Sequence, residues 1–298
     1  MTNFLNLVTA GVALGFQYAL VALGFVVIFK ATHVINFAQG GFVMFGAYLT
    51  YQFGSVMGLP FALAVVLAMI GTALLGVLVE RLILKRMVGK PPFALIMITV
   101  GLLFIIQEVV TRLWGFDALS IGDPWGIDTV DVGGIVIEVA DIWAMVLGAI
   151  VIAAFFAFFR FTSLGLAMRA TALDQEAALA QGMSARRVFA SAWGISGAVA
   201  ALAGVVIASG PGGLTPQVQF VALLAFPAII LGGLDSPGGA VIGGIVIGVT
   251  QTLTAGYQND WAPWLGQNFQ TVMPYVVMVI VLLIRPYGLF GTPEVKRI

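Results

Sequence analysis

The chain has 298 residues, of which 61% are hydrophobic and 9% are charged, and its mean hydropathy is +1.09. A soluble domain carries about 25% charged residues, so this composition excludes a soluble fold. The absence of cysteine, the single histidine and the net charge of zero leave no basis for disulfides, histidine-rich metal sites or a nucleic-acid partner.

Long apolar runs follow one another along the whole chain. A transmembrane helix needs about 20 mainly apolar residues and satisfies its own backbone hydrogen bonds, which lipid cannot do. We therefore predict an all-α, polytopic transmembrane helix bundle in a single domain, residues 1–298. The eight or nine predicted membrane segments are residues 5–29, 34–54, 60–79, 93–114, 141–159, 188–209, 219–234, 238–255 and 271–285. Glycine and proline near the start of the second segment and within 210–255 indicate that some pieces are short or re-entrant.

The charges between these segments are strongly asymmetric. Under this assignment twelve basic residues fall on one side of the membrane and only Arg112 falls on the other. The twelve are Lys30, Arg81, Lys85, Arg86, Lys90, Arg160, Arg169, Arg186, Arg187, Arg285, Lys296 and Arg297. Basic residues concentrate on the cytoplasmic side of membrane proteins, so we predict an N-terminus outside and a C-terminus inside.

Residues 115–140 form the one sizeable segment that this topology places on the extracytoplasmic side. Valine and isoleucine alternate with polar residues or glycine from Ile127 to Glu138, a pattern typical of a β-hairpin. The segment is either a docking surface for an external protein or a solvated connector, and the pattern favours neither.

Few polar side chains fall inside the predicted spans, and glycines accompany them. Asn36 and Gln39 precede Gly40 at the start of the second segment, and Gln17 lies in the first. Small residues let helices approach closely, and this packing role accounts for most intramembrane glycines. Broken helices with free backbone groups at mid-depth are typical of translocation paths. These four residues are therefore candidates for a path as well as for packing.

The longest polar island, residues 169–187, separates two apolar spans. Thr171 followed by Asp174 matches a capping box, with Thr171 as the helix N-cap. Asp174 and Glu176 then lie in the first turns, where their charges complement the helix dipole. Gly182 is placed as the residue that stops the helix. We predict a short capped helix, residues 171–183, on the cytoplasmic surface.

Such a helix offers a surface that a cytoplasmic partner can bind and displace. Its alanines, Ala177 among them, favour helix and are small enough for a partner's groove to close around them. Ser184 can cap the helix that follows. The alternative is a capped surface helix that has no partner.

Three separated motifs carry a family resemblance. Glu176-Ala-Ala-x-x-x-Gly182 is similar to the opening of the motif by which permease subunits of bacterial ABC importers engage their ATPases. The proline that usually ends that motif is missing, because no proline occurs between Pro124 and Pro211. Together with the Arg169-Ala170 lead-in, two further runs resemble the branched-chain amino acid ABC transporter permeases: Val34-Ile-Asn-Phe-Ala-Gln-Gly-Gly-Phe-Val-Met-Phe-Gly-Ala-Tyr48 and Pro227-Ala-Ile-Ile-Leu-Gly-Gly-Leu-Asp-Ser-Pro-Gly-Gly-Ala240.

The resemblance implies an assembly in the bacterial inner membrane. A multi-pass permease of this kind pairs with a second homologous permease, two cytoplasmic ATPase subunits and an extracytoplasmic substrate-binding protein. ATP and Mg²⁺ are used by the ATPases, and this chain binds no cofactor. The solute would be a branched-chain or other hydrophobic amino acid, or a related small polar solute.

The same resemblance implies roles for particular residues. Residues 171–183 would be the coupling helix, with Asp174, Glu176, Ala177 and Gly182 as ATPase-coupling residues and Arg169 leading into them.

Two other classes of function compete with this one. An ion-coupled secondary transporter or channel would act without an ATPase, but carboxylates that could form a proton relay are scarce in mid-membrane positions. An intramembrane enzyme would need a reactive constellation, and the sequence offers no catalytic residues. Gly89-Lys90 is followed by prolines rather than Ser or Thr, so we expect no phosphate-binding loop and no ATP hydrolysis by this chain.

Overall fold

The computed structural model describes residues 2–87, 90–126, 128–173, 178, 181–210, 212–266 and 268–291. Two long helices form the centre of the bundle: α1 (Thr2–Thr32) and α8 (Ala185–Ala208). About three quarters of the apolar window of each helix is buried, against less than a third for α3 (Phe61–Leu82), α4 (Pro92–Trp114) and α5 (Val139–Phe161). The exposed faces of these outer helices are apolar, which is the arrangement that a lipid environment or a membrane partner requires.

Six helices in the described part of the chain are long and apolar enough to cross a membrane, and they include α10 (Pro237–Trp261). Three others, predicted above as membrane segments, are short: α2 (Gln39–Tyr51), α9 (Val221–Gly232) and α11 (Met273–Ile284). At 1.5 Å per residue, 12 or 13 residues reach only about 20 Å, less than the roughly 30 Å hydrocarbon core.

The fold is therefore a polytopic helical membrane bundle, as predicted, with short pieces near residues 34–54 and 219–234. The expectation that 238–255 is also a short piece is wrong, because α10 is a continuous helix of 25 residues. Its many glycines do not break it. They let α10 approach α1 closely: a Cβ built on Gly244 of α10 would lie 2.7 Å from the Gly15 carbonyl oxygen of α1.

Several short elements connect these helices. They are the π-helical turn Gln52–Val56 after α2, the 3₁₀ turns Leu84–Met87, Pro216–Phe220, Pro263–Leu265 and Phe269–Thr271, and helix α6 (Ser163–Leu173). Strands β1 (Thr129–Val132) and β2 (Ile135–Glu138) form the antiparallel hairpin that the sequence pattern predicts, with Gly133 and Gly134 at positive φ in its turn.

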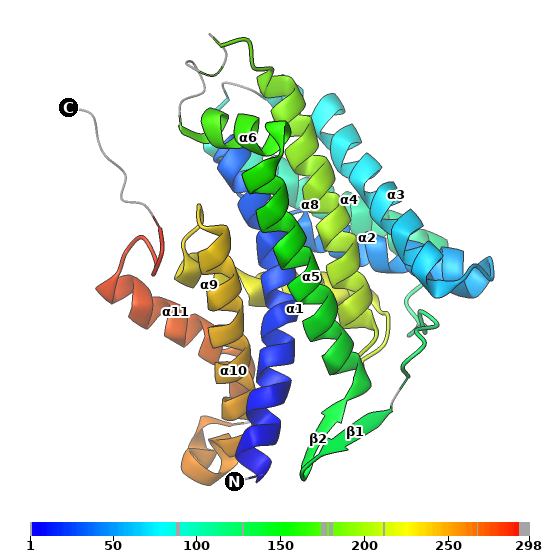
Figure 1. The fold of residues 1–298 in the computed structure, drawn as a ribbon, viewed down its shortest axis with the longest axis vertical. Coiled ribbons are helices and arrows are strands. Elements are labelled where there is room, and N and C mark those ends of the chain that lie inside the picture. Colours follow the sequence, from blue (N-terminus) through cyan, green and yellow to red (C-terminus); the bar gives the residue numbers. More distant parts are fainter. Residues whose placement is uncertain are drawn as a thin grey trace.

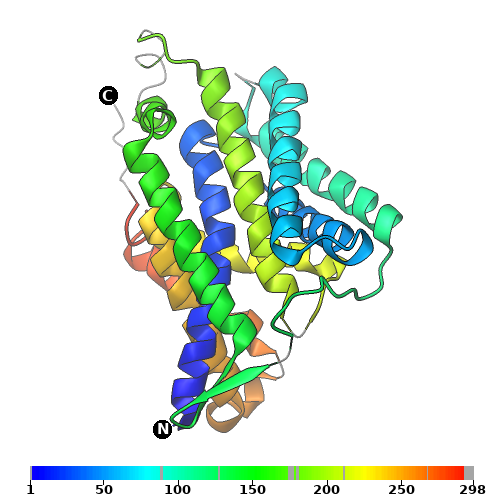
Figure 2. The ribbon, with the colours of Figure 1, turned by 45° about the vertical axis from the view of Figure 1, so that its right-hand side comes forward.

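Figure 1 shows that the hairpin and the N-terminal end of α1 lie at one end of the bundle, while α6 and the start of α8 lie at the other. The backbone N–H of Val136 donates to the Asn6 side chain, which ties β2 to the start of α1. Figure 2 shows α3 and α5 rising to the end at which α8 begins. The segments that carry most of the basic residues therefore gather at the end opposite the hairpin.

Residues near the end of the described chain cap the C-terminus of the short helix α9. After α11 the chain turns back, and the backbone N–H groups of Leu289 and Phe290 donate to the carbonyl oxygens of Leu231 and Gly232 at 2.8 and 3.1 Å. These carbonyls belong to the last turn of α9, which has no helical partners for them. Residues 289 and 290 thus complete the hydrogen bonding of a helix that lies more than 50 positions earlier in the chain.

Candidate functional site

The polar island begins inside a helix rather than at the start of one. Helix α6 starts at Ser163, and the hydroxyl of Thr162 accepts a hydrogen bond from the backbone N–H of Gly165 at 3.0 Å. Thr171 lies within α6, where its hydroxyl donates to the Ala167 carbonyl at 2.8 Å. The prediction of Thr171 as an N-cap is therefore wrong. A threonine hydroxyl can bond back to the previous turn as well as forward, and here the helix that precedes it decides between the two.

The end of the island has the geometry of a helix C-terminus. Gly182 has φ +80°, and the Met183 N–H donates to the Ala178 carbonyl at 3.1 Å, the bond expected when glycine stops a helix. Ser184 caps α8, since its hydroxyl accepts from the Arg187 N–H at 3.4 Å. Both local predictions are confirmed, while a role in ATPase coupling stays a prediction. Asp174, Glu176 and Ala177, the central candidates for it, lie outside the described residues.

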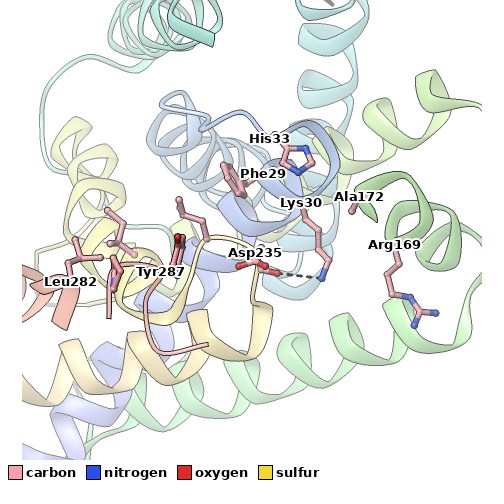
Figure 3. Close-up of a pocket in the computed structure, with 11 residues that line it drawn as sticks. Phe29, Lys30, His33, Arg169, Ala172, Asp235, Leu282 and Tyr287 are labelled. Carbon is pink, nitrogen blue, oxygen red and sulfur yellow. Dashed lines mark hydrogen bonds between the residues drawn. The ribbon is translucent and has the colours of Figure 1, made fainter. Parts of the chain in front are cut away.

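Arg169 lines an open pocket of about 580 Å³ at this end of the bundle (Figure 3). The walls come from the end of α1 (Phe29, Lys30, His33), from α6 (Arg169, Ala172), from the α9–α10 turn and from the chain after α11. Lys30 points across the pocket, and its Nζ donates to the Asp235 carbonyl at 3.4 Å. Helix α6 itself contacts α1, α5 and α8, so a displacement of α6 would act on these helices.

A second cluster lies within the bundle, around the start of α2. The side chains of Asn36, Gln39, Thr99 and Ser196 are completely buried. The Ser196 hydroxyl lies 2.8 Å from Gln39 Oε1 and 2.9 Å from the Gly24 carbonyl, to either of which it can donate. Asn36 Nδ2 donates to the same Gln39 oxygen at 3.4 Å. This cluster joins α1, α2 and α8 at one point.

The backbone break before α2 is also satisfied locally. The Asn36 side chain accepts from the Ala38 N–H at 3.0 Å, and the Thr99 hydroxyl accepts from the Phe37 N–H at 3.1 Å. Gly40 lies next to this break, and a Cβ on it would overlap the Gln219 carbonyl. The break is thus closed by protein groups, as non-helical backbone at membrane depth requires.

Three of the four path candidates are therefore neighbours, and the fourth is not. Asn36, Gln39 and Gly40 meet around the start of α2. Gln17 is partly exposed on α1, and no hydrogen bond within the described residues joins it to that cluster. The enclosure of Asn36 and Gln39 supports the packing interpretation in the arrangement seen here, and their place on a path remains a prediction.

The sequence reasoning missed Ser196, and it noted Thr99 and Gly24 only as a polar residue and a glycine inside the predicted spans. Each is a single small residue in a long apolar helix, and only the packing of the helices shows what it contacts. Ser196 lies between Ile195 and Gly197, and that small-residue context in α8 was the one available signal.

Gly24 provides the space that Gln39 occupies, which gives a direct test of the cluster. A Cβ on Gly24 would overlap Gln39 Nε2, a buried atom that finds no hydrogen-bond partner in the described part of the chain. We expect Gly24→Ala to lower the melting temperature of the purified protein by about 3 °C or more, the usual effect of overfilling a packed site. Adding Gln39→Ala should recover most of that loss, because the shorter side chain frees the space. Gln39→Ala alone is expected to alter transport without preventing assembly; strictly additive losses in the double variant would contradict the contact.

The chain is similar in sequence to known membrane transport proteins over nearly its whole length. The model of a family described as "Branched-chain amino acid transport system / permease component" matches residues 7–282. The high-affinity branched-chain amino acid transport system permease protein LivH of Salmonella typhimurium is 29% identical, covering 99% of this chain and 98% of that protein. BraD of Pseudomonas aeruginosa, described in the same words, is 27% identical with the same coverage. A probable LivH of Methanocaldococcus jannaschii is 27% identical over 94% of this chain and 90% of its own.

Proposed function

The chain belongs to the family of permease components of branched-chain amino acid transport systems, and from this premise we propose that it is the permease subunit of an ATP-driven importer. The solute class proposed is branched-chain or similar hydrophobic amino acids, because the relatives LivH and BraD are named for their transport. The match extends over nearly the whole chain, and this full-length similarity is the observation that carries the proposal.

We propose that the end of the bundle formed by α6, Gly182 and the start of α8 faces the cytoplasm. The distribution of basic residues supports this orientation, since the positively charged side of a membrane protein lies inside. Two ATPase subunits would then bind at residues 171–183. We infer that this segment can transmit movement to α1 and α8. Three features support this: the helix end at Gly182, the cap that Ser184 provides for α8, and the position of Arg169 on α6 at the pocket beside α1.

The opposite end would face the extracytoplasmic side of the bacterial inner membrane and receive a substrate-binding protein. The hairpin of β1 and β2 supports this, because it projects from the bundle and its first strand is exposed throughout. A second homologous permease would cover part of the apolar outer surface. Only the ATPase subunits would bind and use ATP and Mg²⁺.

Reconstitution of the chain with its candidate partners tests the proposal. We expect proteoliposomes that contain the permease pair, the ATPases and the binding protein to take up labelled leucine only when ATP is hydrolysed. The chain alone, under a proton or sodium gradient, should take up none. Uptake by the chain alone, without ATP, would instead establish the ion-coupled transporter or channel.

A further inference from the structure

A buried carboxylate lies at the end of α3, where the sequence shows only the edge of an apolar span. Glu80 is 3% exposed, and no group within the described residues donates a hydrogen bond to its Oε2. A buried charge without a partner is costly, so such groups are usually paired or functional. This residue takes no part in the site described above.

The packing of α3 on α8 shows which structure Glu80 faces. A Cβ on Gly197 would overlap the Thr72 carbonyl, and a Cβ on Gly76 would overlap the Trp193 carbonyl. The residue numbers rise along α3 as they fall along α8, so the helices are antiparallel and their backbones touch. Glu80 follows Gly76 by one turn and lies on the same face. It therefore faces the beginning of α8.

The first turn of α8 carries the matching charge. Arg186 lies seven residues, or two turns, before Trp193, on the face of α8 that packs against α3. Arg81 and Lys85 also carry positive charge near Glu80, but they follow it in its own stretch of chain, so Arg186 is the cation that the facing helix offers. The N-terminus of α8 adds its own positive end of the helix dipole.

We propose that Glu80 is a positioning residue that holds the first turn of α8 against α3 through Arg186. That turn follows directly on Gly182 and Ser184, so a displacement of the proposed coupling segment would reach the membrane helices first at this pair. With Glu80 in place, α8 and α3 move together; without it, the start of α8 moves alone. The part of this inference that concerns transport rests on the proposed function, whereas the pairing itself does not.

A double-variant cycle on the purified protein tests the pairing without any assay of transport. Glu80→Gln and Arg186→Gln are measured singly and together by thermal unfolding. Arg186→Gln leaves a buried anion without its facing cation, so Glu80→Gln should be more favourable in that background than in the original chain, by about 3 °C or more. The control is Arg187→Gln: both arginines are exposed, but Arg187 does not share the face of α8 that carries Trp193 and Gly197, so in its background Glu80→Gln should act as it does in the original chain. Additive shifts, or equal non-additivity with Arg187, would overturn the pairing.

The coupling ratio of the reconstituted transporter tests the positioning role. Glu80→Gln and Arg186→Gln should each lower the solute moved per ATP hydrolysed by about fivefold or more, and the double variant should be no worse than either one. Arg187→Gln should keep the original ratio. If the original transporter hydrolyses ATP and imports solute, an unchanged ratio of solute moved per ATP in Glu80→Gln would overturn the role in coupling. Uptake by the original chain without ATP would overturn the coupling role together with the proposed function, and the unfolding cycle would still decide the pairing.

Discussion

Gly46→Leu is expected to abolish the folded protein. A Cβ at Gly46 would overlap the Cα and Cβ of Ala201, so α2 and α8 are in backbone contact at this point. Neither backbone can move aside, because Gly204 meets the Val43 carbonyl in the same way one turn along. Overpacking against a flexible side chain costs about 1–3 kcal/mol, and against two helix backbones the cost should exceed that range. The measurement is the yield of monodisperse protein extracted from membranes.

Gly101→Leu is the matched control for this variant. Gly101 lies on the exposed side of α4, and no atom of another described segment lies within 4 Å of a Cβ built on it. The same substitution should therefore change the yield little. Equal loss from both variants would show that leucine in any glycine position harms insertion, and that the α2–α8 contact is not the cause.

Gly182→Val is expected to uncouple ATP hydrolysis from transport while leaving the protein inserted. A β-branched residue at φ +80° is strained by about 1–3 kcal/mol, so the helix end at residues 178–183 should rearrange. Glu176→Lys should have the same effect by reversing a charge in the proposed contact with the ATPase. The readouts are ATPase activity and solute uptake from one preparation of the reconstituted transporter.

Gly58→Val separates strain at the proposed coupling segment from strain in general. Gly58 has φ +70° and, like Gly182, no described atom of another segment within 4 Å of a built Cβ. It lies just before the N-terminus of α3, away from the end of α3 that faces the start of α8. This variant should keep hydrolysis and uptake coupled. If Gly58→Val uncouples them equally, or if Gly182→Val and Glu176→Lys leave coupling intact, the assignment of residues 171–183 is wrong.

The sequence was sufficient for the architecture because the properties that define it are local. Apolar length predicted the helices, alternation predicted the β1–β2 hairpin, and the positions of Gly182 and Ser184 predicted a helix end and a cap. The local rule failed at Thr171, where a capping-box pattern occurs inside a helix that started eight residues earlier. It also failed for α10, whose glycines serve contact with α1 rather than a break.

The interior of the site could not be predicted, because it depends on contacts between distant parts of the chain. Gln39 was a candidate from its place beside a break, but its contacts with Gly24 and Ser196 follow from the crossing of three helices. Glu80 was not a candidate, since its burial depends on how closely α8 approaches. Small residues that permit close approach carry no signal of which helix approaches them.

The contact of Leu289 and Phe290 with the end of α9 has a consequence for biogenesis. Translation produces these two residues more than 50 residues after the end of α9. Until then the terminal carbonyls of α9 lack the donors that they have in the finished protein, and α9 and α11 cannot adopt their final arrangement. Maturation of this corner of the bundle therefore waits for the synthesis of residues 289 and 290, and a chain truncated before residue 289 should remain a substrate for membrane quality-control proteases.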